Sequence, residues 1–164
     1  MHPIRRPTAL PPLARLLLLA LALGACVPSV LGRRDAYRDV EARLHELVNR
    51  HRAERGLPPL VHDPAVAAIA RAHSRRMAMG RVPFGHRGFQ ARAREVRAFR
   101  PSGWISENVA VNTFDRRASP AMALKGLAGS RKHRRNLEGP FAATGIGVAR
   151  GRNGSYYYTQ LFVH

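Results

Sequence analysis

The sequence predicts an α+β fold in which helices cover a mainly antiparallel sheet, and three observations lead to this class. Apolar residues recur at helical spacing within residues 35–80. Apolar and small residues then alternate along residues 144–149, which are predicted to be a strand, and the aromatic and apolar run 156–163 is predicted to be its hairpin partner. Between them lies Asn153-Gly154, a pair that favours a tight type I′ hairpin turn with both residues at positive φ.

Two helices are expected in the first half of the chain. The first begins near Asp35 and ends before Gly56, because glycine stops a helix. The second begins at Asp63-Pro64, an N-cap residue followed by a proline at the first helical position, and ends at Gly80. Many alanines in this second segment would permit close packing against a neighbouring element.

The middle of the chain is expected to hold a short basic helix at residues 90–99, a strand at 104–112 and a further helix from 119 to 129. A basic loop at 130–136 then precedes the strand at 144–149. Two glycines at positions 145 and 147 of that strand indicate that another backbone or a ligand lies close to it.

The chain is strongly basic, with 28 Lys and Arg against 10 Asp and Glu and a formal net charge of +18 over 164 residues. Its length favours one domain with a substantial core. A surface of this charge is expected to associate with polyanions, which include nucleic acid, anionic lipid headgroups and acidic envelope polymers. The single cysteine excludes an internal disulfide.

The N-terminus predicts export. Basic residues precede a short apolar run, Leu16 to Leu23, which is shorter than the about 20 residues of a membrane span. The run ends in Leu23-Gly24-Ala25-Cys26, which resembles a bacterial lipobox with Cys26 as the lipidated residue. We therefore expect a lipoprotein signal peptide at 1–25, a tether at 26–34 and a domain at 35–164. A plain signal peptide or an uncleaved anchor, with Cys26 incidental, is the alternative.

Export would limit the partners of the protein to molecules of the cell envelope or the exterior. We expect a protein of the cell envelope, anchored through lipidated Cys26 to a membrane that faces the periplasm or the exterior. Its basic surface would then meet anionic lipid or an envelope polymer. Nucleic acid, which the basic run 131–135 could bind, is not expected as a partner, because export removes it and no stacking aromatics interrupt that run.

Three polar side chains stand out from their local patterns: His86, Glu107 and His133. His86 lies in a glycine-punctuated loop, and His133 lies among cations, either in a cleft or on a solvent-facing loop. Glu107 interrupts an apolar strand, where a carboxylate is costly unless it is paired, so it marks either a site or a salt bridge to a nearby arginine. Two imidazoles and one carboxylate could hold Zn²⁺ with an open position, or act as a proton-transfer pair.

The other histidines are expected to be structural. His45 and His51 are assigned to the surface, and His62 precedes an N-cap. His73 is expected to be a buried, hydrogen-bonded helix residue.

The order of motifs after residue 36 resembles the CAP superfamily, which takes in cysteine-rich secretory proteins, antigen 5 and the pathogenesis-related 1 proteins and is also called the SCP domain. The similar segments are Leu47-Val48-Asn49-x-x-Arg52, Ala70-x-x-His73-Ser74-x-x-Met77, His86, Ser106-Glu107-Asn108-Val109-Ala110, Ser130-x-x-His133-Arg134-x-Asn136-Leu137, Thr144-Gly145-Ile146-Gly147-Val148-Ala149 and Tyr158-Thr159-Gln160-Leu161-Phe162. The resemblance implies a three-layer α-β-α sandwich with a cleft lined by His86, Glu107 and His133.

The sequence departs from the family pattern at several positions. Ser106 stands where the family usually has glycine, and Leu127 where a tryptophan usually lies. The second cleft glutamate of eukaryotic members has no counterpart, since nothing between Arg116 and Lys132 is acidic. A metal site at His86, Glu107 and His133 would therefore have a single carboxylate to balance the ion's charge.

The resemblance implies two kinds of function. Family members elsewhere bind sterols and lipids, which favours a membrane-anchored envelope protein that binds an apolar or anionic ligand in its cleft. A metal-dependent hydrolase that acts on envelope peptides or polymers, with Zn²⁺ as its cofactor, is the alternative. The sequence shows no obvious activated nucleophile, and it lacks the common hydrolase and nucleotide-binding motifs, so we expect binding rather than catalysis.

Overall fold

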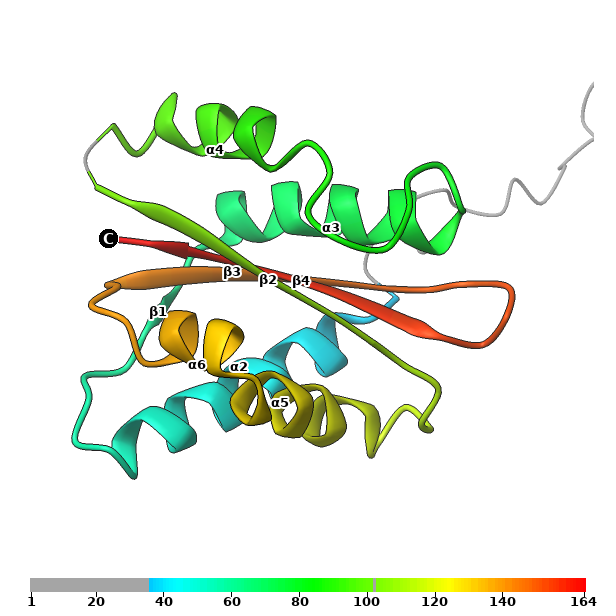
Figure 1. Ribbon diagram of the computed structural model, residues 1–164, viewed down its shortest axis with the longest axis horizontal. Helices are drawn as coiled ribbons and strands as arrows, with labels where there is room; N and C mark the ends of the chain where they lie inside the picture. Colours follow the sequence, from blue (N-terminus) through cyan, green and yellow to red (C-terminus); the bar gives the residue numbers. More distant parts are fainter. Residues whose placement is uncertain (1–35, 102) are drawn as a thin grey trace, which may run out of the picture. The chain divides into compact units, whose positions relative to one another are not determined.

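A four-stranded sheet forms the middle layer of the domain (Figure 1). The structure is a computed structural model that describes residues 36–101 and 103–164. The strand order is β1-β3-β4-β2, with bounds β1 Val61–His62, β2 Ile105–Asn112, β3 Ala143–Arg150 and β4 Tyr156–Val163. The predicted signal peptide, the tether and Cys26 lie outside the described residues.

Three of the four strands pair antiparallel, as predicted. β4 lies between β2 and β3 and runs antiparallel to both. The sheet is nevertheless mixed, because β1 pairs parallel to β3 through Val61 and Ala143. This two-residue strand was not predicted, since both of its side chains are exposed and no alternation marks it.

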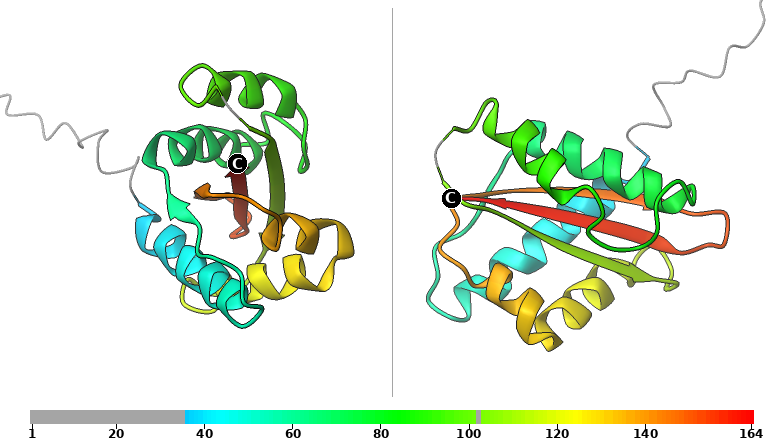
Figure 2. Two further views of the ribbon diagram at one scale, coloured as in Figure 1. Left: turned by 90° about the vertical axis from the view of Figure 1, so that its left-hand side faces the viewer. Right: turned by 45° about the horizontal axis from the view of Figure 1, so that its top comes forward.

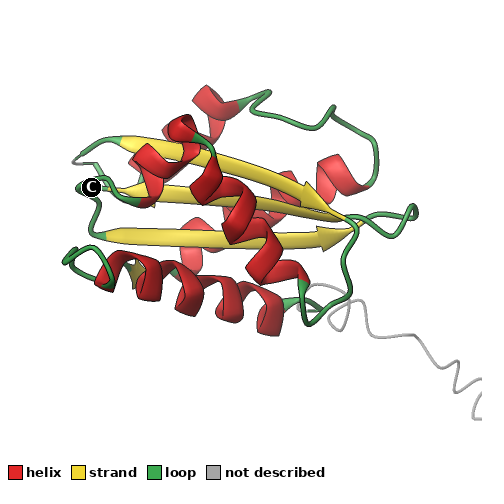
Figure 3. Ribbon diagram, turned by 60° about the horizontal axis from the view of Figure 1, so that its bottom comes forward, coloured by secondary structure: helices red, strands yellow, loops and turns green. Residues whose placement is uncertain are grey.

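Helices cover both faces of the sheet, which confirms the α-β-α sandwich (Figures 2 and 3). One layer holds α2 (Arg38–Ala53), α5 (Ser119–Gly129) and α6 (Arg131–Leu137), and the other holds α3 (Pro64–Ala78) and α4 (Phe89–Arg97). Each layer has its own apolar core. The first includes Val40, Leu44, Val48, Leu127, Ile146 and Phe162. The second includes Val66, Ile69, Val96, Ile105 and Leu161.

The glycines of β3 admit α3 directly against the sheet. A Cβ atom added to Gly145 would lie 2.2 Å from the backbone nitrogen of Ala67, and one added to Gly147 would lie 2.0 Å from that of Arg71. The hydroxyl of Ser74 also donates to the Gly147 carbonyl over 2.8 Å. The predicted close approach of another backbone to this strand is therefore confirmed, and that backbone is α3.

The predicted start of α3 is confirmed as well. The Asp63 carboxylate accepts hydrogen bonds from the backbone N–H groups of Ala65 and Val66 over 2.9 and 3.1 Å. Its other oxygen accepts from Arg100 over 2.9 Å. Burial opposes ionisation of Asp63, but these bonds outweigh it and lower the carboxyl pKa.

Residues 131–137 form helix α6, so the predicted loop is wrong there. The helix is only 7 residues long, and Leu137 is its one buried side chain, so no apolar periodicity marks it in the sequence. An isolated helix of this length is not stable in water, and α6 depends on its tertiary contacts.

The turn between β3 and β4 also differs from the prediction. The register pairs Arg150 with Tyr156, so the connection spans residues 151–155 rather than two residues. A type I′ turn needs two consecutive residues with positive φ, and no described non-glycine residue has one. Within residues 151–155 only Gly154 has a positive φ, of 82°. The Asn153 side chain instead accepts from the Ser155 N–H over 3.1 Å, a local turn that encloses Gly154.

Two histidines are less exposed than predicted. His51 is buried, not on the surface, because Glu138 at the end of α6 covers it and lies 3.0 Å from its Nε2 atom. His45 is half-buried, with Nε2 2.9 Å from the Leu60 carbonyl oxygen. His62 is exposed just before the Asp63 cap.

Among the described residues, no helix has both the length and the apolar character that crossing a membrane requires.

Candidate functional site

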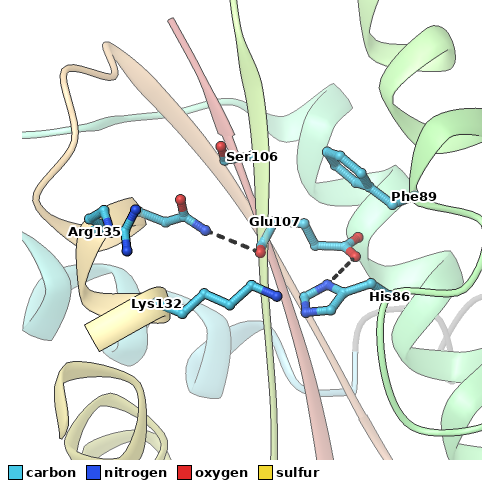
Figure 4. Close-up of a pocket in the computed structure, with 7 residues that line it drawn as sticks. His86, Phe89, Ser106, Glu107, Lys132 and Arg135 are labelled. Carbon is cyan, nitrogen blue, oxygen red and sulfur yellow. Dashed lines mark hydrogen bonds and ion pairs between the residues drawn. The ribbon is translucent and has the colours of Figure 1, made fainter. Parts of the chain in front are cut away.

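A cleft of about 650 Å³ follows strand β2, between the α3–α4 loop and helix α6 (Figure 4). It combines imidazole, carboxylate, cationic, polar and aromatic side chains. Its lining residues are His86, Phe89, Ser106, Glu107, Lys132, Arg135 and Asn136. Segments far apart in the sequence therefore meet in one cavity at an edge strand of the sheet.

Glu107 reaches this cleft from β2, but its charge is already neutralised. Its side chain is only 1 % exposed. Arg92 of α4 donates to both carboxylate oxygens, from Nε to Oε2 over 2.7 Å and from Nη2 to Oε1 over 2.7 Å. His86 adds a contact between its Nδ1 atom and Oε1 over 3.0 Å. The sequence left open whether Glu107 marks a functional site or a salt bridge to a nearby arginine. The structure shows the salt bridge, to Arg92, and Glu107 also lines the cleft.

Arg92 was not singled out from the sequence, where it is one arginine among many. A charged side chain on the inward face of a short helix is the signal that could have found it. Its Nη1 atom donates to the Arg87 carbonyl over 3.0 Å and to Nδ1 of His73 over 3.2 Å. The guanidinium is therefore held from several directions.

His73 supports Arg92 from α3, which confirms that it is buried and hydrogen-bonded. Its Nε2 atom lies 2.9 Å from the Gly85 carbonyl oxygen. Because Arg92 can only donate, the neutral ring accepts at Nδ1 and donates from Nε2. Burial, and then the charge of Arg92, lower the pKa of His73, although the bond to Gly85 acts in the opposite sense.

His86 and His133 lie beside each other without being bonded. The centroids of their rings are 6.4 Å apart, and the rings are tilted by 34°. His86 lines the cleft, whereas His133 is not among the lining residues. Burial lowers the pKa of His133, and the charges of His86 and Lys132 lower it further.

Helix α6 supplies cleft residues that the sequence analysis did not identify. Lys132, Arg135 and Asn136 lie at spacings of three and four, which place them on one side of a helix. Asn136 donates from Nδ2 to the Asn108 side-chain oxygen over 2.8 Å and to the Glu107 carbonyl over 3.3 Å. These bonds fix α6 to β2, so recognising the helix would have revealed the residues.

The donor set does not fit the three-ligand zinc site that the sequence suggested. Within the described part of the chain, no group of three His, Cys, Asp or Glu side chains is placed to hold one ion. Both Glu107 oxygens are engaged by Arg92, so a dication bound there would lie next to a guanidinium.

The model of the cysteine-rich secretory protein family, CAP, matches residues 45–162. Comparison with curated proteins gives no match.

Several solved structures share the fold. An extracellular protein containing an SCP domain from Bacillus anthracis has a TM-score of 0.64 and 26% identity over 80% of this chain and 42% of that chain. A cysteine-rich secretory protein from Staphylococcus aureus has a TM-score of 0.61 and 20% identity over 77% and 39%. An outer surface protein from Borrelia burgdorferi has a TM-score of 0.60 and 15% identity over 76% and 92%. The chain thus covers less than half of the Bacillus and Staphylococcus proteins.

Proposed function

The chain belongs to the cysteine-rich secretory protein (CAP) family, and we propose that it is an exported envelope protein that binds an anionic ligand in the cleft beside β2. The observation that carries the proposal is the balance of charge in that cleft. Lys132 and Arg135 line it from α6, and the one lining carboxylate, Glu107, is paired with Arg92. The cavity therefore presents uncompensated positive charge.

Lys132 and Arg135 are available to a ligand, because neither of them is paired with a carboxylate of the described chain. Figure 4 draws the Lys132 side chain extending toward His86 across the cleft. No ion pair of Lys132 or Arg135 occurs among the described residues. Hydrogen bonds from ionised donors to carboxylate or phosphate oxygens are stronger than those from neutral donors. The cleft offers two such donors, Lys132 and Arg135.

Two ligand classes that the sequence left open have less support. An apolar ligand would need an apolar wall, and Phe89 is the one large hydrophobic side chain that lines the cleft. Hydrolysis would need a metal or an activated nucleophile, and the Glu107 carboxylate is bound to Arg92. Zinc analysis of protein purified without chelator separates binding from metal-dependent hydrolysis.

The proposed location rests on the relatives and on the N-terminus. The similar bacterial structures are described as extracellular or outer-surface proteins. The segment Leu23-Gly24-Ala25-Cys26 favours lipidation at Cys26, which would hold the domain at a membrane. A domain there would meet anionic lipid or acidic envelope polymers.

Calorimetric titration with inorganic polyphosphate tests the cleft. At about 0.15 M salt, where distant surface charges are screened, the Lys132→Ala/Arg135→Ala protein should bind at least about tenfold more weakly than wild type. The matched control is Lys125→Ala/Arg152→Ala, which removes the same charges from exposed positions outside the cleft. Equal losses in the two double variants would mean that binding follows net charge and that the cleft is not the site.

A further inference from the structure

We infer that Trp104 forms a stacking subsite at the end of the cleft and that the ligand is an anionic polysaccharide. The inference rests on the proposed function, because it assigns the anionic groups of the ligand to Lys132 and Arg135. It adds a ring-binding surface that neither the charges nor the family resemblance supplies.

Trp104 is unusually exposed for its type. It is the only tryptophan of the chain, and it is 69 % exposed at the start of β2. Tryptophan offers a large rigid surface at a low cost in conformational entropy, which makes it a common anchor in binding sites. At 69 % exposure, the indole is accessible to a partner at the edge of the sheet.

The backbone of Trp104 is hydrogen-bonded to the C-terminal residue. The His164 N–H donates to the Trp104 carbonyl over 3.1 Å, and the two rings lie 6.0 Å apart between centroids. Gly103 has φ 107°, and a Cβ atom there would lie 2.7 Å from the His164 Cβ. Only glycine meets both conditions, which locks the start of β2 against the C-terminal residue.

Trp104 lies one residue before β2 and does not line the cleft itself; strand alternation gives the face on which its indole lies. Side chains two residues apart in a strand share a face, at a spacing of about 7 Å, so Trp104, Ser106 and Asn108 point the same way. Ser106 lines the cleft. Asn108 on the same face accepts from Asn136 of α6. The face that carries Trp104 is thus continuous with the wall that carries Arg135 and Asn136.

This combination of groups suits a charged sugar chain. The C–H groups of a sugar ring pack on an aromatic face, while its carboxylates or phosphates would pair with Lys132 and Arg135. An unbranched polyanion without rings would use the cations alone. A bilayer is the main competing partner, because an exposed tryptophan on a strongly basic chain also suits a membrane interface.

Two soluble polyanions and one fluorescence experiment test the inference. Polygalacturonate carries a carboxylate on every sugar ring, and polyphosphate carries comparable charge without rings. Wild type should bind polygalacturonate about tenfold more tightly than polyphosphate at equal charge, since stacking on an aromatic face contributes about that factor. Because Trp104 is the only tryptophan, polygalacturonate should also protect the emission of the protein from acrylamide quenching.

Variants separate stacking from charge. Trp104→Ala should abolish the preference for polygalacturonate and leave polyphosphate binding unchanged, whereas Trp104→Phe should retain part of the preference. Phe114→Ala is the control, since Phe114 is also an exposed aromatic residue, 47 % exposed, and does not line the cleft. Melting curves of the variants show that a lost preference does not come from unfolding.

Each remaining outcome overturns the inference. Equal binding of the two polyanions by wild type, or a preference that survives Trp104→Ala, removes the subsite. Quenching protection by phosphatidylglycerol vesicles but not by polygalacturonate assigns Trp104 to a membrane. If in any of these outcomes the Lys132→Ala/Arg135→Ala protein binds polyphosphate more weakly than its surface control does, the cleft still binds an anionic ligand, but without a subsite at Trp104. If that protein behaves like its surface control, both proposals fail.

Discussion

The guanidinium of Arg92 and the carboxylate of Glu107 are both buried, and each is satisfied chiefly by the other. Removing charges from water is costly, and the attraction within a pair offsets that cost only while both partners remain. The pair also connects α4 to β2, with His73 and His86 as further contacts. This ion pair therefore holds α4 against β2, and it also neutralises the one carboxylate that lines the cleft.

Replacing one partner of this pair should destabilise the protein strongly. We expect Arg92→Met to lower the free energy of unfolding by about 3–5 kcal/mol, because Glu107 is left buried without its cation. The double variant Arg92→Met/Glu107→Gln should recover much of that loss. Urea denaturation measures both. Arg94→Met on the exposed side of α4 is the control, with a change within about 0.5 kcal/mol. Equal effects at 92 and 94 would contradict a buried pair.

The pH dependence of stability should report on His73. Its pKa in the folded protein is lowered from 6.5, first by burial. As the pH falls below 6.5, His73 therefore takes up its proton in the unfolded chain before it does so in the folded protein. The free energy of unfolding decreases over the range from 6.5 down to the pKa of the folded protein. Melting temperatures at about pH 7.5 and about pH 5.5 should differ less in His73→Gln than in wild type. An unchanged difference would show that other groups cause the acid sensitivity.

At the scale of elements, the two faces of β3 have opposite requirements. Ile146 and Val148 fill the core on the side of α2, while Gly145 and Gly147 leave room for α3 on the other side. The spacing between α3 and the sheet is therefore set by the absence of side chains at those two positions.

Adding one methyl group at this contact should be costly. In Gly147→Ala the new Cβ would lie 2.0 Å from the Arg71 nitrogen and 2.3 Å from the Ala70 carbonyl carbon, and helix backbone cannot move aside. We expect destabilisation of about 1–3 kcal/mol or more, measured by urea denaturation. Gly126→Ala in α5 is the matched control, because nothing lies within 4 Å of its Cβ position. That change should be neutral or stabilise by up to about 1 kcal/mol. Similar losses at both glycines would argue against close packing.

Helix α6 shows how an element can depend on its surroundings. Its end is held by Arg52, whose Nη1 atom donates to the Leu137 carbonyl over 2.7 Å. Its start is held by Arg134, which donates to the Ala128 carbonyl over 3.1 Å. These contacts come from α2 and α5, so the cleft residues of α6 are placed by the whole helical layer.

For the whole molecule, anchoring is the property with the clearest test. We expect Cys26→Ser to move the protein from the membrane fraction to the soluble fraction, because the basic surface alone binds a membrane reversibly and is screened by salt. Fractionation with a high-salt wash measures the change, and mass spectrometry of the wild-type N-terminus identifies the lipid. A Cys26→Ser protein that stays bound after the wash would contradict lipid anchoring.

The sequence by itself determined the fold class, the helices α2 to α5, the long strands and the close contact at the β3 glycines. These features have local causes: apolar periodicity, the Asp63 cap, alternation along residues 144–149 and the aromatic and apolar run 156–163. Glu107 was also found locally, since a carboxylate contrasts with an apolar strand, and His86 stood out in a glycine-punctuated loop.

Only the tertiary structure decided the chemistry of the cleft. Glu107 pairs with Arg92, which lies 15 positions earlier, and although its place on the inward face of a short helix marks Arg92 as unusual, nothing local shows which carboxylate it pairs with. The parallel strand β1 and helix α6 are too short for periodicity to reveal, and both exist through contacts with β3, α2 and α5. Charge compensation and short elements depend on residues distant in the chain, so they become visible only when the chain has folded.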